Sequence, residues 1–174
     1  MPNKLRELML LRHAKSDWKE NDLSDIERPL SDKGKKNAAK LGKWLLQQNL
    51  MPDLILVSPA LRAQQTLKRI CNECPASAIT VDSLYLADIP QLKQILADAP
   101  FAERIMLIGH NPGLESLYNM LVSEAPDSHV QLFPTCAMAH LILPSDWKNI
   151  EQGDGKLQQF VTPKDYKNGI KDFA

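Results

Sequence analysis

The sequence predicts an α/β fold in which a mainly parallel central sheet is flanked by helices, with an antiparallel edge strand near the C-terminus. Two observations lead to this prediction. Short apolar runs typical of buried strands alternate with segments whose apolar residues recur at helical spacing. Such alternation is typical of parallel strands joined by helices. The length of 174 residues fits one domain with one substantial core, so we expect a single domain over residues 1–174.

The expected strands are apolar runs bounded by polar or turn-forming residues. The first run, at residues 7–11, reads Glu-Leu-Met-Leu-Leu. The turn signal Gly153-Asp154-Gly155 precedes the last run, which we expect to pair antiparallel at an edge of the sheet. Residues 163–174 are expected to form a loosely held tail. In order, the expected strands are residues 7–11, 54–57, 79–81, 104–108, 137–143 and 156–161.

Four helices are expected between these strands. Ser31 is a favourable N-cap for the first, and Asp32 in its first turn favours the helix dipole. Gly34 is costly in this helix unless the backbone packs closely against another segment. Pro59 suits the opening of the second helix. The expected helices run from Ser31 to near Asn49, from Pro59 to about Cys74, between Pro90 and Pro100, and from about Gly113 to Val122.

The composition is that of a soluble globular protein. Hydrophobic residues make up 44% of the chain, charged residues make up 24%, and the formal net charge is zero. Nucleic-acid-binding chains usually carry a basic excess, so we expect no nucleic acid as partner. The first apolar run is too short for the core of a secretion signal or for a membrane span. We therefore expect no membrane association and a cytoplasmic location.

The three cysteines are expected to be reduced thiols. Their odd number, in a chain without a secretion signal, favours the cytoplasm, where disulfides are rare. Cys71 and Cys74 form a C-x-x-C pair, but this spacing alone is a weak indication of a redox or metal site. We interpret them as two small apolar residues on one helix face.

Cationic and nucleophilic side chains follow three of the expected strands. Arg12 and His13 come directly after the first strand. Arg62 comes a few residues after the second, and His110 closely follows the strand at residues 104–108. Ligands of open α/β sheets bind just beyond the carboxyl ends of the strands. We therefore expect two arginines and two histidines to meet in one crevice, which would suit a phosphoryl group.

These residue types supply what phosphoryl transfer needs, which is positive charge around the equatorial oxygens and a nucleophile in line with the leaving group. An arginine fork binds two oxygens at once, and a neutral imidazole has a free lone pair. Nearby guanidinium groups disfavour an imidazolium, so we expect them to hold down the pKa of the nucleophilic histidine. The other two histidines, His129 and His140, are weaker candidates, because one lies in a polar connection and the other in an apolar strand.

Four segments of the chain carry a more specific signal. They are Leu11-Arg12-His13-Ala14-Lys15-Ser16-Asp17-Trp18, Arg28-Pro29-Leu30-Ser31 with Gly34, Ser58-Pro59-Ala60-Leu61-Arg62-Ala63-Gln64-Gln65-Thr66, and Gly109-His110-Asn111-Pro112. Together and in this order they resemble the motifs of the histidine phosphatase superfamily. The Ala-Lys-Ser that follows the first histidine is similar to the small SixA-type phosphohistidine phosphatases, since most relatives have glycine after that histidine. The likeness spans about residues 7–143.

The resemblance implies a three-layer phosphoglycerate-mutase-like fold and a phosphatase that needs no metal or other cofactor. It implies that His13 is a nucleophile that becomes transiently phosphorylated, and that water then hydrolyses the phosphoenzyme. It also implies that His110 stabilises the transition state. The residues expected to bind the phosphoryl group and the rest of the substrate are Arg12, Arg62, His110, Ser16 and Lys15.

Two departures from the family pattern bear on the substrate. Lys19 stands where many relatives have a phosphate-contacting asparagine. The region that supplies a carboxylic general acid in many relatives shows no clear match, which leaves Asp17, Asp82 and Asp88 as candidates. Imidazole leaves more easily than an alkoxide, so a missing acid favours phosphohistidine as substrate.

Only the connections at residues 12–30 and 123–135 are free to form walls, which favours an open pocket that admits a side chain of a folded protein. We therefore expect a phosphorylated protein as partner, such as a histidine phosphotransfer domain or a phosphotransferase-system protein. Two alternatives stay open. One is a phosphatase or mutase for a small phosphorylated metabolite, which would need a true acid and a walled pocket. The other is a non-catalytic phosphate-binding module.

Overall fold

Six strands form one sheet in the computed structural model of the chain, which describes residues 5–122 and 131–167. Their order across the sheet is β3-β2-β4-β1-β5-β6. The first four strands of the chain are parallel, and β5 runs antiparallel to both β1 and β6. The expected mainly parallel sheet with antiparallel pairing at its C-terminal edge is confirmed. The strands are β1 (Arg6–Arg12), β2 (Leu54–Val57), β3 (Ser77–Thr80), β4 (Arg104–Gly109), β5 (Met138–Leu143) and β6 (Lys156–Val161).

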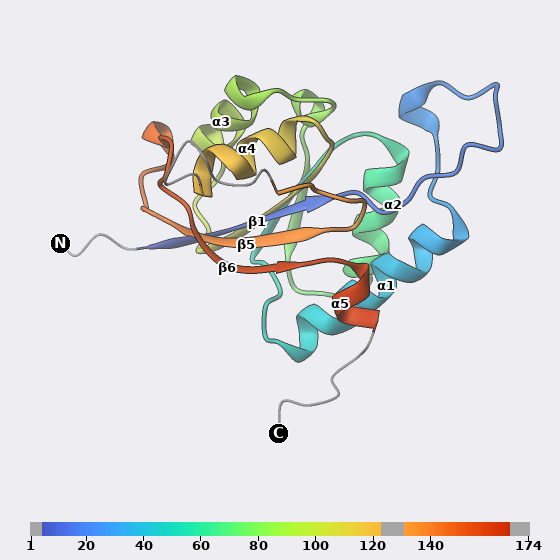
Figure 1. Cartoon of the computed structure of the whole chain (residues 1–174), viewed down its shortest axis with the longest axis horizontal. Coiled ribbons are helices and arrows are strands. Elements are labelled where there is room, and N and C mark those ends of the chain that lie inside the picture. Colours follow the sequence, from blue (N-terminus) through green and yellow to red (C-terminus); the bar gives the residue numbers. More distant parts are fainter. Residues whose placement is uncertain (1–4, 123–130, 168–174) are drawn as a thin grey trace.

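Helices cover both faces of the sheet and give three layers (Figure 1). α3 and α4 pack on one face, and α1, α2 and α5 pack on the other. The helices are α1 (Asp32–Gln47), α2 (Leu61–Ile70), α3 (Ile89–Asp98), α4 (Gly113–Val122) and α5 (Pro163–Lys167), with short 3-10 turns η1 (Asp25–Glu27), η2 (Asp82–Leu84) and η3 (Trp147–Asn149).

The central strands contribute side chains to two hydrophobic cores, one on each face of the sheet, because successive residues of a strand point to opposite faces. On β1, Leu8 and Leu10 pack with α3 and α4, whereas Met9 and Leu11 pack with α1 and α2. All four side chains are fully buried. The continuous apolar run of β1 is thus explained by a strand that is covered on both faces.

The N-terminus of α1 is packed against the segment that follows β1. As predicted, Ser31 caps the helix, and its Oγ accepts a hydrogen bond from the backbone N–H of Gly34 at 3.1 Å. The same hydroxyl donates to the backbone carbonyl of Lys15 at 3.0 Å. A Cβ atom at Gly34 would overlap that carbonyl oxygen. The close backbone packing that the glycine suggested is therefore confirmed, and it holds Lys15 beside the start of α1.

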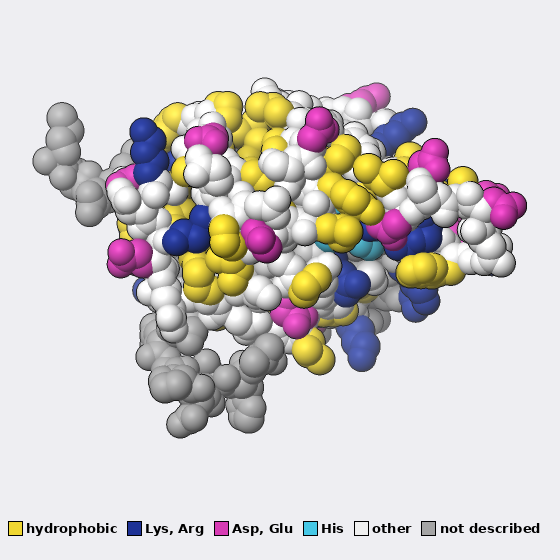
Figure 2. Space-filling model, turned by 90° about the horizontal axis from the view of Figure 1, so that it is seen from above, with side chains coloured by type: hydrophobic (Ala, Val, Ile, Leu, Met, Phe, Trp, Pro, Cys, Tyr) yellow, Lys and Arg dark blue, Asp and Glu magenta, His cyan; other side chains and the backbone are white. Residues whose placement is uncertain are grey.

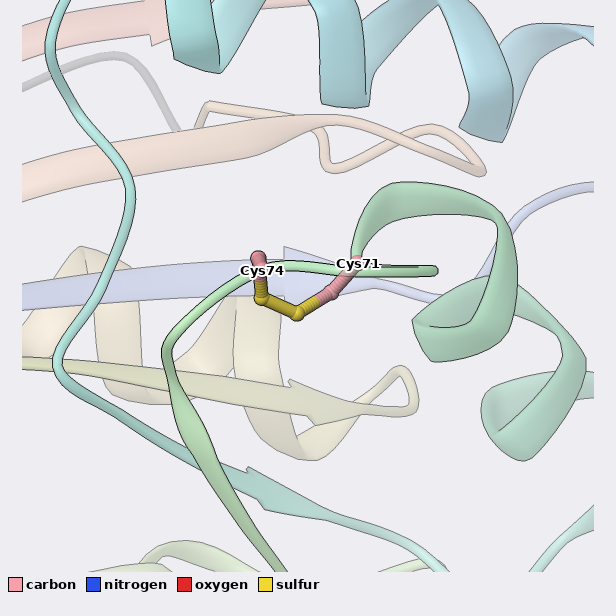
Figure 3. Close-up of a disulfide and its surroundings, with 2 residues drawn as sticks. All are labelled: Cys71 and Cys74. Carbon is pink, nitrogen blue, oxygen red and sulfur yellow. A yellow bond between two sulfur atoms is a disulfide. The ribbon is translucent and has the colours of Figure 1, made fainter.

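The C-terminal end of α2 differs from the prediction. The helix ends at Ile70 rather than near Cys74, and a disulfide joins Cys71 to Cys74 in the loop that leads to β3 (Figure 3). The expectation of reduced thiols on one helix face is therefore wrong for this pair. The chain leaves the helix at Cys71, which brings the two Cα atoms to 5.0 Å, a separation typical of disulfides. Cys136 has a free, buried thiol.

The segment after β6 also differs from the prediction. It begins with α5, whose Tyr166 is buried in the core beside α1 and donates a hydrogen bond to the carbonyl of Cys136 at 3.1 Å. The expected loosely held tail is therefore wrong for residues 163–167, because an aromatic ring anchors them. Residues 168–174 lie outside the described part of the chain.

The carboxyl ends of β1, β2 and β4 meet at one edge of the sheet. Arg12 of β1 lies opposite Gly109 of β4, and Val57 of β2 lies opposite Ile108. Figure 1 shows the segment after β1 extending beyond this edge before it returns to α1. Within residues 5–122 and 131–167, no helix has the length and apolar character that a membrane span requires.

Candidate active site

Arg12, His13, Arg62 and His110 line one cavity of about 840 Å³ at this edge of the sheet. Arg12 is the last residue of β1, Arg62 lies in the first turn of α2, and His110 follows β4. Three of the four are buried, and Arg62 is only 2% exposed. Figure 2 shows a small patch of histidine atoms at the surface, with hydrophobic, acidic and Lys or Arg side chains beside it. The fold thus brings together side chains that are far apart in the sequence.

Arg62 connects the two histidines. Its Nε donates a hydrogen bond to His13 Nε2 at 3.2 Å, and its Nη2 donates to His110 Nδ1 at 3.3 Å. A guanidinium can only donate, so both of these ring nitrogens are unprotonated. The other nitrogen of each ring is the donor: His13 Nδ1 bonds to the carbonyl of Ala14, and His110 Nε2 bonds to Ser58 Oγ, both at 2.7 Å. Both imidazoles are therefore neutral, and the lone pair of His13 is on Nε2.

Burial in the cavity floor keeps both imidazoles uncharged. It lowers the pKa of His13 to about 4, and the charges of Arg62 and Arg12 act in the same direction. Burial also lowers the pKa of His110 to about 3, with His13 and Arg62 adding to the effect. The sequence suggested the guanidinium groups as the cause. The structure shows that the loss of hydration on burial is the larger cause.

We expect both histidines to stay neutral far below the ordinary imidazole range, and NMR signals of their ring protons should keep their neutral positions down to about pH 5. Their folded pKa values lie below the unfolded value of about 6.5, so the unfolded state binds more protons between about pH 4 and pH 6.5. The free energy of unfolding should therefore fall as the pH drops through this window, by up to about 1.4 kcal/mol per pH unit for each histidine. Urea titrations at several pH values measure the slope. A His13 signal that titrates near pH 6.5 would contradict this expectation.

Asp25, which the sequence did not single out, is the one carboxylate among the described residues that line the cavity. It accepts hydrogen bonds from the hydroxyl of Tyr85, from Arg28 Nη2 at 2.8 Å and from Arg62 Nη2 at 3.0 Å. The hydrogen bonds from Tyr85 and Arg28 are the largest causes that hold the pKa of Asp25 well below its usual range. An ionised carboxylate has no proton to donate, so Asp25 is a counter-ion for the two arginines. No local pattern marks it, because its partners lie in other segments.

None of the three carboxylates considered as general acids is among the residues that line the cavity. Asp88 caps α3 by accepting from the backbone N–H of Gln91 at 2.9 Å. Asp17 accepts from the backbone N–H of Lys19 at 2.9 Å, and Asp82 begins η2 at an exposed position. Lys19 is exposed and is likewise not a lining residue. The candidate acids therefore have other structural roles or face solvent.

Lys15 and Ser16 both line the cavity, in different settings. Ser16 is buried, and its hydroxyl accepts a hydrogen bond from Arg28. Lys15 is exposed at the mouth. The sequence did not predict two further lysines of the lining, Lys33 in the first turn of α1 and Lys164 in α5. An exposed lysine on a helix carries no signal of its own, so only the packing of these helices places the two side chains here.

The remaining histidines do not line the cavity. His140 is buried on β5, where its Nε2 lies 2.7 Å from Glu7 Oε2, so its ring has a polar partner away from the cavity. His129 belongs to residues 123–130, which lie outside the described part of the chain. Within the described residues, no group of three or more His, Cys, Asp or Glu side chains could hold a metal ion.

The guanidinium of Arg12 is positioned by a network that begins at Glu115 on α4. Arg12 Nη1 donates to the carbonyl of Phe133 at 2.9 Å, and Asn111 Nδ2 donates to the same carbonyl at 2.9 Å. Glu115 Oε2 accepts from the backbone N–H of Phe133 at 2.9 Å and from Asn111 Nδ2 at 3.2 Å. Glu115 Oε2 thus holds both the backbone of Phe133 and the side chain of Asn111, and the carbonyl of Phe133 in turn accepts from Arg12.

We expect Glu115→Ala to weaken the affinity for inorganic phosphate about tenfold, because the Phe133 carbonyl that fixes Arg12 loses its anchor. Glu115→Gln keeps a side-chain oxygen that can accept both hydrogen bonds, so its affinity should stay within about threefold of the original. Calorimetric titration with phosphate measures both variants, with Glu151→Ala on the exposed surface as control. Equal losses in the Ala and Gln variants would show that the charge of Glu115 matters rather than its hydrogen bonds.

A family model for the histidine phosphatase superfamily (branch 1) matches residues 8–88. The phosphohistidine phosphatase SixA of Escherichia coli K12 is 29% identical over 168 residues, which are 92% of this chain and 96% of that protein. An uncharacterised protein of Mycobacterium tuberculosis is 30% identical over 161 residues, 88% of this chain and 100% of that protein. A chloroplastic protein of Arabidopsis thaliana is 35% identical over 128 residues, and the chain spans only 59% of its length.

Solved structures share this architecture. The protein histidine phosphatase SixA in complex with tungstate superposes with a TM-score of 0.74 at 26% identity, over 91% of this chain and 98% of that chain. A protein of Nakamurella multipartitia that is assigned as a SixA phosphohistidine phosphatase gives a TM-score of 0.81 at 26% identity, over 94% and 99% of the two chains. The predicted three-layer fold is thereby confirmed.

Proposed function

This chain belongs to the histidine phosphatase superfamily, and within it to the SixA type, and on that basis we propose that it removes the phosphoryl group from phosphohistidine on a protein partner. The proposed reaction passes through a transient phosphohistidine at His13 and needs no metal ion. The observation that carries the proposal is the neutral imidazole of His13, with its lone pair on Nε2 beside Arg62. The coarser activity, that of a phosphatase, is supported by the family together with the likeness to SixA.

The proposed reaction has two displacements at phosphorus. In the first, His13 Nε2 forms a bond to phosphorus while the bond between phosphorus and the substrate imidazole breaks. The substrate ring carries a proton on its other nitrogen when this bond breaks, so it leaves as a neutral imidazole. In the second, water attacks phosphorus and the bond to His13 breaks, which gives inorganic phosphate and restores the neutral imidazole.

The cations of the cavity are proposed to bind the phosphoryl oxygens in both steps. Arg12 and Arg62 each offer a planar fork of N–H donors to the negative charge on these oxygens. Nδ1 of His110 carries no proton in the structure, since it accepts from Arg62. A bound phosphoryl dianion favours protonation of a nearby imidazole, so His110 would then become a donor to one of its oxygens.

The nature of the leaving group supports phosphohistidine as the substrate. An alkoxide needs a proton donor, and a general acid contributes about 10²–10⁴-fold to such a reaction. Asp25 is held ionised, and the three other candidate acids are not among the lining residues. An imidazole departs without such a donor once it is protonated near its own pKa. The described cavity therefore favours phosphohistidine over an ordinary phosphate ester.

Release of phosphate from a phosphorylated histidine phosphotransfer domain tests the proposal. We expect the enzyme to release phosphate from this phosphorylated domain at least about 100-fold faster than from a sugar phosphate, because the ester would require general acid catalysis. A phosphorylated phosphotransferase-system protein serves as the second substrate. Fast turnover of the sugar phosphate, with no release from either protein, would overturn the proposal in favour of a small metabolite.

The cytoplasmic location stays a prediction, and we also expect a role in signalling to accompany this function. The disulfide between Cys71 and Cys74 bears on the first of them, because disulfides are rare in the cytoplasm. Cell fractionation, with thiol labelling of the two cysteines in each fraction, tests the location and the oxidation state together.

A further inference from the structure

We propose that the mouth of the cavity is a docking surface for an acidic protein face that carries the phosphohistidine. This inference rests on the proposed function and adds the chemistry of the partner surface to it. The surface consists of Lys15, Lys33, Lys164, Arg28, Trp18 and Leu86, all of which line the same opening as His13.

Charge is the first observation. The described lining contains six cations, Arg12, Lys15, Arg28, Lys33, Arg62 and Lys164, and one carboxylate, Asp25. Asp25 is already neutralised by ion pairs with Arg28 and Arg62 at 2.8 and 3.0 Å. An opening so rich in positive charge attracts and orients an acidic partner.

The lysines form an outer group that the phosphoryl group itself does not need. Lys15, Lys33 and Lys164 are exposed, and none of them forms an ion pair with another described residue. They come from three separate segments, namely the loop after β1, the first turn of α1, and α5. A single phosphoryl group is already matched by the two arginines beside His13. The outer lysines therefore suit negative charges that surround the phosphohistidine.

Two exposed apolar side chains complete the surface and favour a protein over a small anion. Trp18 is 72% exposed, and its ring lies 3.6 Å from the guanidinium carbon of Arg28. Arg28 is held in turn by Ser16 and Asp25, so the indole rests on a fixed cation. Tryptophan and arginine are the side chains that most often dominate the affinity of protein interfaces.

Leu86 adds an apolar contact next to the site. It is 52% exposed and adopts a positive φ of 50°, a strained conformation for a bulky side chain. Tyr85, its neighbour, donates to Asp25 and stacks edge-on against His110 at 5.4 Å between ring centroids. The strained turn thus holds a leucine at the mouth of the cavity while Tyr85 contacts the site. Figure 2 shows hydrophobic, Lys or Arg and acidic side chains near the histidine patch.

Three phosphohistidine peptides of equal length test this surface, with glutamate, glutamine or lysine residues flanking the phosphohistidine. We expect kcat/KM to be about tenfold higher for the acidic than for the neutral peptide at low ionic strength, and the preference to vanish at about 1 M salt. The lysine-flanked peptide should be the slowest of the three. Trp18→Ala should raise KM and leave kcat for the bound peptide little changed.

Reversing the charge of two lysines at the mouth of the cavity, here called the rim, supplies the decisive comparison. Lys33→Glu with Lys164→Glu should cancel or invert the preference for the acidic peptide. Lys40→Glu with Lys43→Glu changes the net charge equally on exposed positions of α1 that do not line the cavity, and should keep the preference. A preference that is unchanged in the rim variant, or absent in the original protein, would overturn the docking surface alone. No hydrolysis of any of the three peptides would instead overturn the proposed function, and this inference with it.

Discussion

Replacement of His13 by alanine is expected to abolish both phosphate release and covalent labelling, with turnover reduced by at least about 10⁴-fold. The reason is that the lone pair of its Nε2 is the group proposed to attack phosphorus. Arg12 and Arg62 remain in the variant, so phosphate or tungstate should still bind. Rapid quenching after mixing with a phosphohistidine donor, followed by intact-mass measurement, detects the transient phosphoryl group on the original protein and its absence in the variant.

His140→Asn is the matched control, because it also removes a buried histidine but one that bonds to Glu7 rather than lining the cavity. That variant should still be labelled. Peptide mapping should place the phosphoryl group on His13. A labelled His13→Ala variant, or a label on another residue, would reject His13 as the nucleophile. An original protein that binds phosphate but is never labelled would support the non-catalytic module instead.

The second large effect is expected at Arg62, where replacement by alanine should lower kcat/KM by about 10²–10³-fold, the size typical of removing one preorganised donor to a developing charge. Arg62 is 2% exposed and donates to His13, His110 and Asp25, so one side chain both binds the phosphoryl group and orients the nucleophile. Arg62→Lys should recover only part of the loss, since a lysine lacks the planar fork that reaches several partners.

Arg69→Ala provides the control on the same helix, because Arg69 is exposed and does not line the cavity. We expect its kcat/KM to stay within about twofold of the original protein, as is usual for a surface substitution. Thermal unfolding of both variants separates a loss of catalysis from a loss of folding. Arg62→Ala activity within a few-fold of the original would show that the phosphoryl group is bound elsewhere.

The elements that could be predicted from the sequence are those whose signals are local. The run at residues 7–11 lies in β1, where a continuous apolar stretch is buried by helices on both faces of the sheet. Ser31 was predicted as the cap of α1 because capping depends on a side chain and a backbone N–H three residues away. The meeting of four side chains at one edge followed from strand direction, since parallel strands end together.

The features that could not be predicted depend on contacts between distant segments. Asp25 is a case in point, since it reaches Arg62 and Tyr85 only because the loop after β1 folds back over the cavity. The sequence did not predict α5, because a helix of five residues is too short to show a helical period. Its Tyr166 is fixed by a hydrogen bond to Cys136, which lies in a distant segment of the chain. The end of α2 was misplaced because nothing before Pro75 marks a stop, while the structure ends the helix at Ile70.

The sequence by itself determined the fold class and the residues that carry the proposed chemistry, because strand and helix periods, caps and the order of strand ends are encoded over a few neighbouring positions. Only the tertiary structure decided which carboxylate enters the site, in which tautomers the histidines are held, and which lysines surround its mouth. These features depend on burial and on the directions of side chains from segments far apart in the chain. Hydrogen bonds and hydration change when atoms move by about an ångström, and no local sequence pattern specifies positions that closely.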